Sequence, residues 1–132
     1  MKNKFDHLEY YLENEISPVR QDVENLNQHL DRREALYTSI GLPKLMIEGK
    51  TVLEVGPGSG HNSLYVASCS PKLYDLLEPN KTAWKDIEKL YAENAKKIKL
   101  IQPNIIKKKL EDFDAYEKYD IVICEAWLGV NN

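Results

Sequence analysis

The sequence predicts a single α/β domain built on a mainly parallel sheet. Short β-branched runs alternate with segments of helical periodicity from residue 50 onward, and this alternation is typical of right-handed strand–helix–strand crossovers. The first of these runs enters a turn that holds three glycines. The length of 132 residues fits about one domain, and the 42% hydrophobic residues supply enough apolar material for its core.

Charge and composition narrow the class of partner. The net charge of −3 provides no broad basic surface, so we expect neither nucleic acid nor an anionic membrane as a partner. The longest apolar runs are far shorter than the roughly 20 residues of a membrane span, and the N-terminus lacks the apolar stretch of a signal peptide. We therefore expect a cytoplasmic protein. The lysine cluster at residues 107–109 should lie on a solvated face. Cys69 and Cys124 lack metal-ligand spacing, which predicts two buried free thiols and no metal site.

Residues 1–48 are predicted to form a helical extension. Apolar residues recur at steps of three and four over residues 5–16, which describes one face of a helix. Ser17 and Pro18 then offer an N-cap and a first helical position. A second helix with a narrow apolar stripe follows and should end near residues 41–43, where glycine and proline stop it.

Residues 49–132 are predicted to hold strands and helices in alternation. Strands are expected at residues 51–55, 73–78, 104–109 and 119–124, and helices at residues 62–68 and after a cap at Asn80 or Thr82. For the third strand, residues 98–101 are a competing choice, and the acidic residues that follow position 109 favour the later one.

The strongest motif lies between the first strand and the next helix. It consists of Glu54, Gly56, Pro57, Gly58 and Gly60. Glycines let the backbone turn sharply and approach a ligand closely, and the free amides at the start of the helix give the turn a positive end. A dinucleotide fingerprint would place glycine at position 61, where the chain has His61. The motif instead resembles that of class I S-adenosylmethionine-dependent methyltransferases.

Features further along the chain agree with this resemblance. Glu78 ends the second strand, where a carboxylate can accept hydrogen bonds from both ribose hydroxyls of an adenosine. In this family an acidic side chain after the third strand meets the adenine and an apolar neighbour covers the ring, which implies these roles for Glu111, Asp112 and Phe113. The run that ends in Glu125 matches the fourth strand, whose end faces the methyl donor.

The resemblance implies a Rossmann-like fold that binds S-adenosylmethionine at the carboxyl ends of the strands and releases S-adenosylhomocysteine. The three glycines would lie under the methionine part of the donor, and Glu54 would orient their loop or reach the donor's amino group. Methyl transfer needs in-line positioning and, for a poor nucleophile, a general base. Glu125 is the strongest candidate base. His61 at the helix start and His29 on the predicted polar face of the front helix are weaker candidates, because a solvated surface position is the simpler interpretation of each.

The acceptor is expected to be a small molecule, such as a metabolite or a sugar. The chain lacks the Asn/Asp-Pro-Pro-aromatic motif of amino-group DNA methylases, and its net charge is acidic. The stretch around Glu125 and Trp127 also resembles the acidic loop of protein arginine methyltransferases, with one extra alanine between the two residues. Arginine methylation is therefore an alternative, and a nucleotide-binding Rossmann protein is a weaker one because position 61 is histidine.

Members of this family build a sheet of seven strands, of which residues 49–132 would supply the first four. We therefore expect a partial S-adenosylmethionine-binding domain preceded by a helical lid, residues 1–48. The apolar strand at 119–124 would be left as an exposed edge, which invites pairing with another chain. A homodimer would cover that edge. A catalytically idle donor-binding fragment, or an oligomerisation module, is the remaining alternative.

Overall fold

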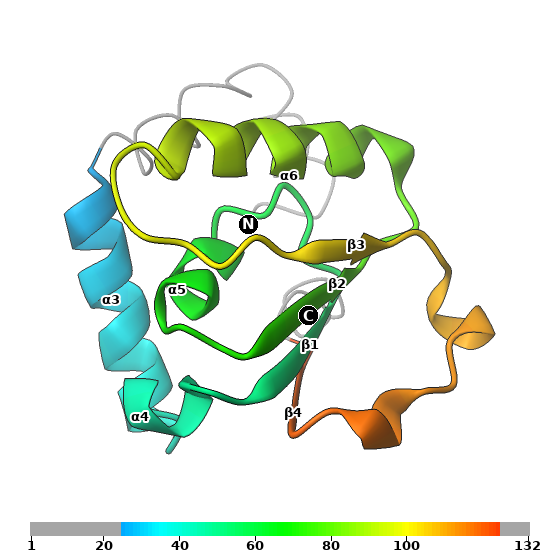
Figure 1. Cartoon of the computed structure of the whole chain (residues 1–132), viewed down its shortest axis with the longest axis horizontal. Helices are drawn as coiled ribbons and strands as arrows, with labels where there is room; N and C mark the ends of the chain where they lie inside the picture. The colour runs from blue at the N-terminus through cyan, green and yellow to red at the C-terminus, as the bar shows by residue number, and fades with distance from the viewer. Residues whose placement is uncertain (1–24, 125–132) are drawn as a thin grey trace, which may run out of the picture.

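The structure, a computed structural model, describes residues 25–124 and is built around a parallel sheet (Figure 1). The strands are β1 (Thr51–Val55), β2 (Leu73–Leu77), β3 (Asn104–Ile106) and β4 (Ile121–Ile123). They lie in the order β3-β2-β1-β4, and each neighbouring pair is parallel. This confirms the predicted fold class and all four predicted strands, with the third at the later of its two candidate positions.

Helices precede, connect and flank these strands. They are α3 (Leu26–Ser39), α4 (Lys44–Ile47), α5 (Ser63–Ser68) and α6 (Lys81–Asn94), with single 3₁₀ turns η1 (Leu110–Asp112) and η2 (Tyr116–Lys118). The predicted stop of α3 is confirmed, because Gly41 follows it with a φ of 85°. Asn80 caps α6 and accepts a hydrogen bond from the Thr82 amide at 2.9 Å. The predicted helix after the glycine turn is α5, whereas the short helix α4 was not predicted.

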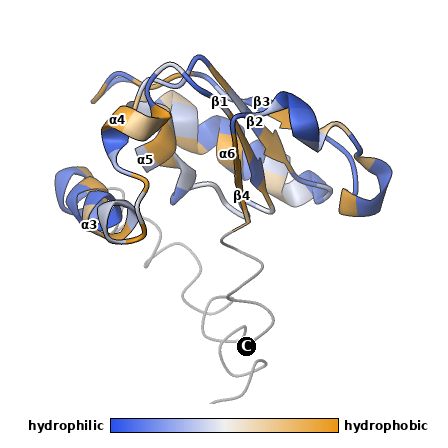
Figure 2. Ribbon diagram, turned by 90° about the horizontal axis from the view of Figure 1, so that it is seen from below, coloured by the Kyte–Doolittle hydropathy of each residue, from blue (hydrophilic) through white to orange (hydrophobic). Residues whose placement is uncertain are grey.

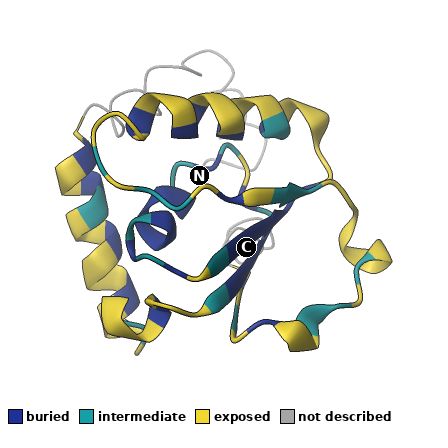
Figure 3. Cartoon of the chain, viewed as in Figure 1, coloured by how far each residue is buried: buried dark blue, intermediate teal, exposed yellow. Residues whose placement is uncertain are grey.

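The two faces of the sheet are covered differently. Val52, Tyr74 and Leu76 pack with the apolar residues of α3, α5 and α6. On the opposite face, Leu53 and Leu77 pack with Tyr119, which belongs to the connecting segment, defined here as residues 107–120 between β3 and β4. Figure 3 shows β1 and β2 buried along most of their length, while the outer sides of α3 and α6 are exposed. The helices and the connecting segment therefore enclose the carboxyl ends of β1 and β2 from different sides.

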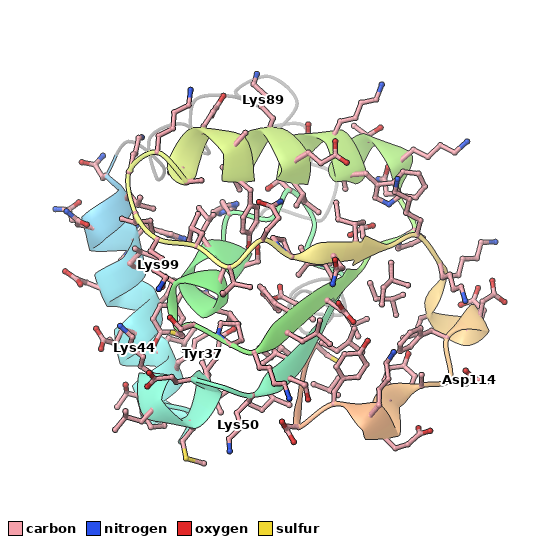
Figure 4. All side chains as sticks on the ribbon, in the orientation of Figure 1. Tyr37, Lys44, Lys50, Lys89, Lys99 and Asp114 are labelled. Atoms are coloured by element: carbon pink, nitrogen blue, oxygen red, sulfur yellow. The ribbon has the colours of Figure 1, made fainter. Side chains whose placement is uncertain are left out.

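Helix α3 packs on α5 through a face that is partly polar. His29, Arg33 and Tyr37 are buried together with Leu26, although Figure 2 shows α3 as mostly hydrophilic. The prediction of a solvated His29 is wrong, because its Nε2 lies 2.9 Å from the backbone oxygen of His61. Tyr37 points inward from α3 (Figure 4), with its ring centroid 5.1 Å from that of Tyr65.

Strand β4 lies at one edge of the described sheet, next to β1. Val122 in the middle of β4 is 41% exposed, and Cys124, which follows the strand, is exposed as well. The prediction of a buried Cys124 is therefore wrong, because the strand before it has a described neighbour on one side only. The prediction for Cys69 is confirmed, since that thiol is buried. Among residues 25–124, no helix has the length and apolar character needed to cross a membrane.

Candidate functional site

A cavity of about 400 Å³ opens at the carboxyl ends of β1 and β2. Its lining consists of Val55, Gly56, Leu77, Glu78, Pro79, Lys109, Leu110 and Glu111. The first five residues end or follow the two strands, and the last three belong to the connecting segment. Ligands of open parallel sheets bind at this end of the strands, and the volume is in the range of small-molecule sites. Three residues predicted from the sequence, Gly56, Glu78 and Glu111, are thus brought together at one cavity.

The glycine turn has the backbone that its residues predict. Gly56, Gly58 and Gly60 have φ values of 67°, 62° and 90°, which side chains with a Cβ rarely adopt. A Cβ on Gly60 would lie 2.9 Å from Cγ1 of Ile87, whereas a Cβ on Gly58 would meet nothing within 4 Å. Gly60 therefore allows α6 to pack against the turn, and Gly58 leaves space beside it. Pro57 is buried and its backbone oxygen accepts a hydrogen bond from the Gly60 amide at 3.1 Å.

Glu78 is held in place by backbone amides. Its Oε1 accepts a hydrogen bond from the Gly58 amide at 3.2 Å, and its Oε2 accepts one from the Asn80 amide at 3.0 Å. Its backbone oxygen accepts the Nε1–H of Trp84 at 2.6 Å. The side chain is 6% exposed, so the protein positions an acceptor-only group at the cavity, with lone pairs remaining for hydroxyl donors.

Four buried polar residues, Glu54, Ser63, Tyr74 and Tyr91, form a layer next to the glycine turn. The Tyr74 hydroxyl donates to Glu54 Oε1 at 2.6 Å, Ser63 Oγ donates to the Gly60 oxygen at 2.5 Å, and Ser63 Oγ lies 2.7 Å from the Tyr91 hydroxyl. Burial, then the nearby Glu54 carboxylate, holds the pKa of Tyr74 well above its usual range, and burial raises the pKa of Tyr91. Both hydroxyls thus keep their protons. Glu54 lies in this layer and does not line the cavity.

Sequence reasoning missed this supporting layer. Its signals were weak, because tyrosines at apolar positions of a strand and a helix, and a serine inside a short helix, are common in ordinary cores. The carboxylates of Glu54 and Glu78, by contrast, are apparent in the sequence, because Glu54 lies within a short apolar strand and Glu78 follows one.

The two candidate histidines lie side by side at the start of α5. Their ring centroids are 5.6 Å apart, and His61 Nδ1 lies 3.2 Å from Ser59 Oγ. Through its contact with the His61 backbone oxygen, His29 links α3 to the end of the glycine turn. Neither ring is among the described residues that line the cavity. Glu125, the strongest candidate base, lies outside the described residues, so its role stays a prediction.

The connecting segment supplies the other wall of the cavity. Glu111 and Leu110 line it, whereas the adjacent Asp112 does not. Phe113 instead packs edge-on against Tyr116, with ring centroids 5.0 Å apart. Lys109 lines the cavity too, and residues 107–109 are all exposed, which confirms the prediction of a solvated face. Figure 4 shows Asp114 on the outer side of this segment.

Within residues 25–124, no group of three or more His, Cys, Asp or Glu side chains could hold a metal ion.

Comparison with known proteins gives one similar sequence and several similar structures. No family model matches the chain. It is 32% identical over 98 residues to the protein arginine N-methyltransferase PRMT10 of Arabidopsis thaliana, and the match covers 74% of this chain. The chain spans about a quarter of the length of that relative, 24%.

Two solved methyltransferases illustrate the structural likeness. Magnesium protoporphyrin IX methyltransferase from Synechocystis, with S-adenosylmethionine bound, matches with a TM-score of 0.54 at 21% identity, over 80% of this chain and 47% of that one. Ribosomal protein L11 methylase from Lactobacillus delbrueckii matches with a TM-score of 0.54 at 19% identity, over 77% and 50%. The chain thus has the Rossmann-like fold of class I S-adenosylmethionine-dependent methyltransferases.

Proposed function

We propose that this chain binds S-adenosylmethionine in the cavity at the carboxyl ends of β1 and β2 and takes part in methyl transfer. The observation that carries the proposal is Glu78, a nearly buried carboxylate that the Gly58 and Asn80 amides hold at the cavity. Its free lone pairs suit the two ribose hydroxyls of the donor. The cavity volume and the glycine turn beside it support the same ligand.

The remaining donor contacts follow from the two sides of the cavity. The turn from Gly56 to Gly60 would face the methionine part, with Glu54 supporting the turn from below through its bond with Tyr74. On the other side, Glu111 would accept a hydrogen bond from the adenine amino group. Leu110 would cover the ring, because it lines the cavity and Phe113 packs elsewhere.

The chemistry needs little covalent help from the protein. When bound, the donor would supply a methyl group on a sulfonium, and its transfer to a lone pair of the acceptor would leave the neutral thioether of S-adenosylhomocysteine. The residues described above bind and orient the donor, which accounts for acceleration by positioning. For an acceptor that must lose a proton, Glu125 remains the proposed base, with His61 and His29 as the weaker candidates.

Two acceptor classes are in competition. The acidic net charge favours a small-molecule acceptor over nucleic acid. The similarity to a protein arginine N-methyltransferase, 32% over 98 residues, favours the guanidinium of a protein arginine, and so does the stretch around Glu125 and Trp127. We therefore take protein arginine as the first acceptor to test and a small molecule as the second.

Donor binding is tested by titration calorimetry of the chain with S-adenosylhomocysteine. Wild type should bind saturably, and Glu78→Ala should raise the Kd by about 100-fold, because it removes hydrogen bonds to a charged group. Asp112→Asn is the matched control and should leave the Kd unchanged, since Asp112 does not line the cavity. A folded wild-type chain that binds no ligand would contradict the proposal and leave the glycine turn as a purely structural element.

Turnover is tested with methyl-labelled S-adenosylmethionine and three acceptors. These are an arginine-rich peptide, the same peptide with lysine in place of arginine, and free arginine. Label in the arginine peptide alone would support a protein acceptor, and label in free arginine would support a small molecule. No label in any of them, together with binding of S-adenosylhomocysteine, would favour the idle donor-binding alternative.

Pairing of two copies along β4 is proposed as well. The support is the position of β4 at the edge of the described sheet and the 41% exposure of Val122. Light scattering should give a dimeric mass for wild type and a monomeric one for Val122→Lys. A monomeric wild type would contradict the pairing. A cytoplasmic location remains a prediction from the sequence.

A further inference from the structure

A buried carboxylate lies in the middle of the sheet, outside the cavity. Asp75 is in β2, between β1 and β3, and is 6% exposed. It points to the face that carries Leu77 and Tyr119, opposite the helices. Burying a charge costs free energy unless the charge is paired or hydrogen-bonded, and an apolar residue would fill such a position at lower cost.

Two hydrogen bonds offset the cost of burying the Asp75 carboxylate. One of the two donors, Tyr119, is 44 positions away in the sequence. Asn104 Nδ2 in β3 donates to Oδ1 at 3.0 Å, and the Tyr119 hydroxyl donates to Oδ2 at 2.6 Å. Tyr119 is 8% exposed and lies near the end of the connecting segment, two residues before β4. Burial, then the bond to Asp75, raises the pKa of Tyr119, so the hydroxyl keeps the proton that it donates.

A series of residue contacts connects Tyr119 to the cavity wall. The Tyr119 ring centroid lies 6.3 Å from that of Phe113, and Phe113 lies edge-on to Tyr116. The Phe113 amide donates to the Leu110 oxygen at 3.2 Å. Leu110 and Glu111 form the cavity wall, which has no strand or long helix of its own. The Asp75–Tyr119 bond is therefore a buried polar tie between the sheet and the segment that carries that wall.

We propose that Asp75 and Tyr119 form a positioning pair that fixes the wall carrying Leu110 and Glu111, and thereby sets the affinity of the cavity for the adenosine end of its ligand. This inference rests on the proposed donor binding. It adds residues that do not touch the ligand and act through Phe113 on those that do.

The main variant is Tyr119→Phe, which keeps the ring and removes the donor. It should raise the Kd for S-adenosylhomocysteine about tenfold, which is within the range for loss of a hydrogen bond to a charged group. The matched control is Tyr65→Phe, a buried tyrosine in α5 that does not line the cavity. The control should leave the Kd unchanged.

Three further variants separate positioning from general stability. Asp75→Asn keeps an oxygen acceptor for Tyr119 and should retain most of the affinity. Asp75→Leu combined with Tyr119→Phe removes both buried polar groups, so its free energy of unfolding should stay near that of wild type, while its Kd should remain raised. Adding Glu111→Gln to Tyr119→Phe should give less than the product of the two single effects, because both act through Glu111.

Hydrogen exchange provides a readout that needs no ligand. The Asp112 and Phe113 amides, which donate to Lys109 and Leu110, should exchange faster in Tyr119→Phe than in wild type. Unchanged exchange of these amides in Tyr119→Phe would overturn the inference. If wild type binds S-adenosylhomocysteine, an unchanged Kd in Tyr119→Phe would overturn it as well. If wild type does not bind but the two amides exchange faster in Tyr119→Phe, the proposed donor binding is overturned, while the role of the Asp75–Tyr119 pair in holding the wall is supported.

Discussion

The two sides of the cavity are built by different means. On the strand side, Val55 and Leu77 are paired in register across β1 and β2, and the Gly56 amide donates to the Leu77 oxygen at 3.0 Å. On the side of the connecting segment, two single 3₁₀ turns are held by ring contacts and by side-chain anchors. Strand pairing thus holds one side, whereas the other has short turns and side-chain contacts in place of strand pairing.

This difference decides which substitutions should affect folding and which should affect binding. Changes in the glycine turn strain a backbone that is part of the sheet layer and should lower global stability. Changes in the connecting segment should leave the sheet intact and loosen the wall, since local structure with few buried contacts opens at low cost.

The largest expected effect is on the strand side, from Gly60→Ala. The new Cβ would lie 2.9 Å from Ile87 Cγ1 at a φ of 90°, so backbone strain and overpacking act together. We expect a loss of about 3 kcal/mol in the free energy of unfolding, measured by urea denaturation.

Gly41→Ala is the matched control for Gly60→Ala. Its φ of 85° is nearly the same, and its Cβ would meet nothing within 4 Å. It should cost only about 1 kcal/mol, from backbone strain alone. Equal losses in the two variants would contradict the role given to Ile87.

The next effect compares two glycines with equal space and different surroundings. Gly58→Ala and Gly49→Ala both place a Cβ in open space at positive φ, 62° and 73°. Their unfolding free energies should fall by similar amounts, about 1 kcal/mol. Only Gly58→Ala should weaken S-adenosylhomocysteine binding, by about tenfold, because its Cβ would occupy the open space beside the turn where the donor is proposed to lie. Equal Kd values for the two variants in calorimetry would show that the turn does not touch the ligand.

A smaller effect is expected from the connecting segment. Glu111→Gln should raise the Kd for S-adenosylhomocysteine about fivefold, since a neutral acceptor replaces a charged one at an exposed position. Its unfolding free energy should not change, because the Glu111 side chain is exposed. A stability loss without a change in Kd would mean that Glu111 is structural and that the wall holds no ligand.

The same contrast explains what the sequence could predict. The four strands, the glycine turn and Glu78 depend on runs of neighbouring residues, and local patterns revealed them. The buried His29 and the Asp75–Tyr119 pair depend on partners 32 and 44 positions away. A polar residue on a helix surface and one in the core look alike in sequence until the packing partner is known, which is why the sequence predicts a solvated His29.

The smallest expected effect concerns the far end of the connecting segment. Asp120 Oδ2 accepts hydrogen bonds from the Thr51 amide and Oγ1 at 3.0 and 3.1 Å. These bonds, backbone first, hold the pKa of Asp120 below its ordinary value of 3.8. A carboxylate with a lowered folded pKa contributes stability above its unfolded pKa and loses it as the pH falls through the folded one.

The stability advantage of wild type over Asp120→Asn should thus be present at pH 7 and shrink below about pH 4. Urea denaturation of both proteins at pH 7 and pH 3 measures this, and because Asp120 is solvent-exposed the difference should be the smallest of the series. An advantage that stays constant between the two pH values would mean that the Thr51 bonds do not depend on the charge of Asp120.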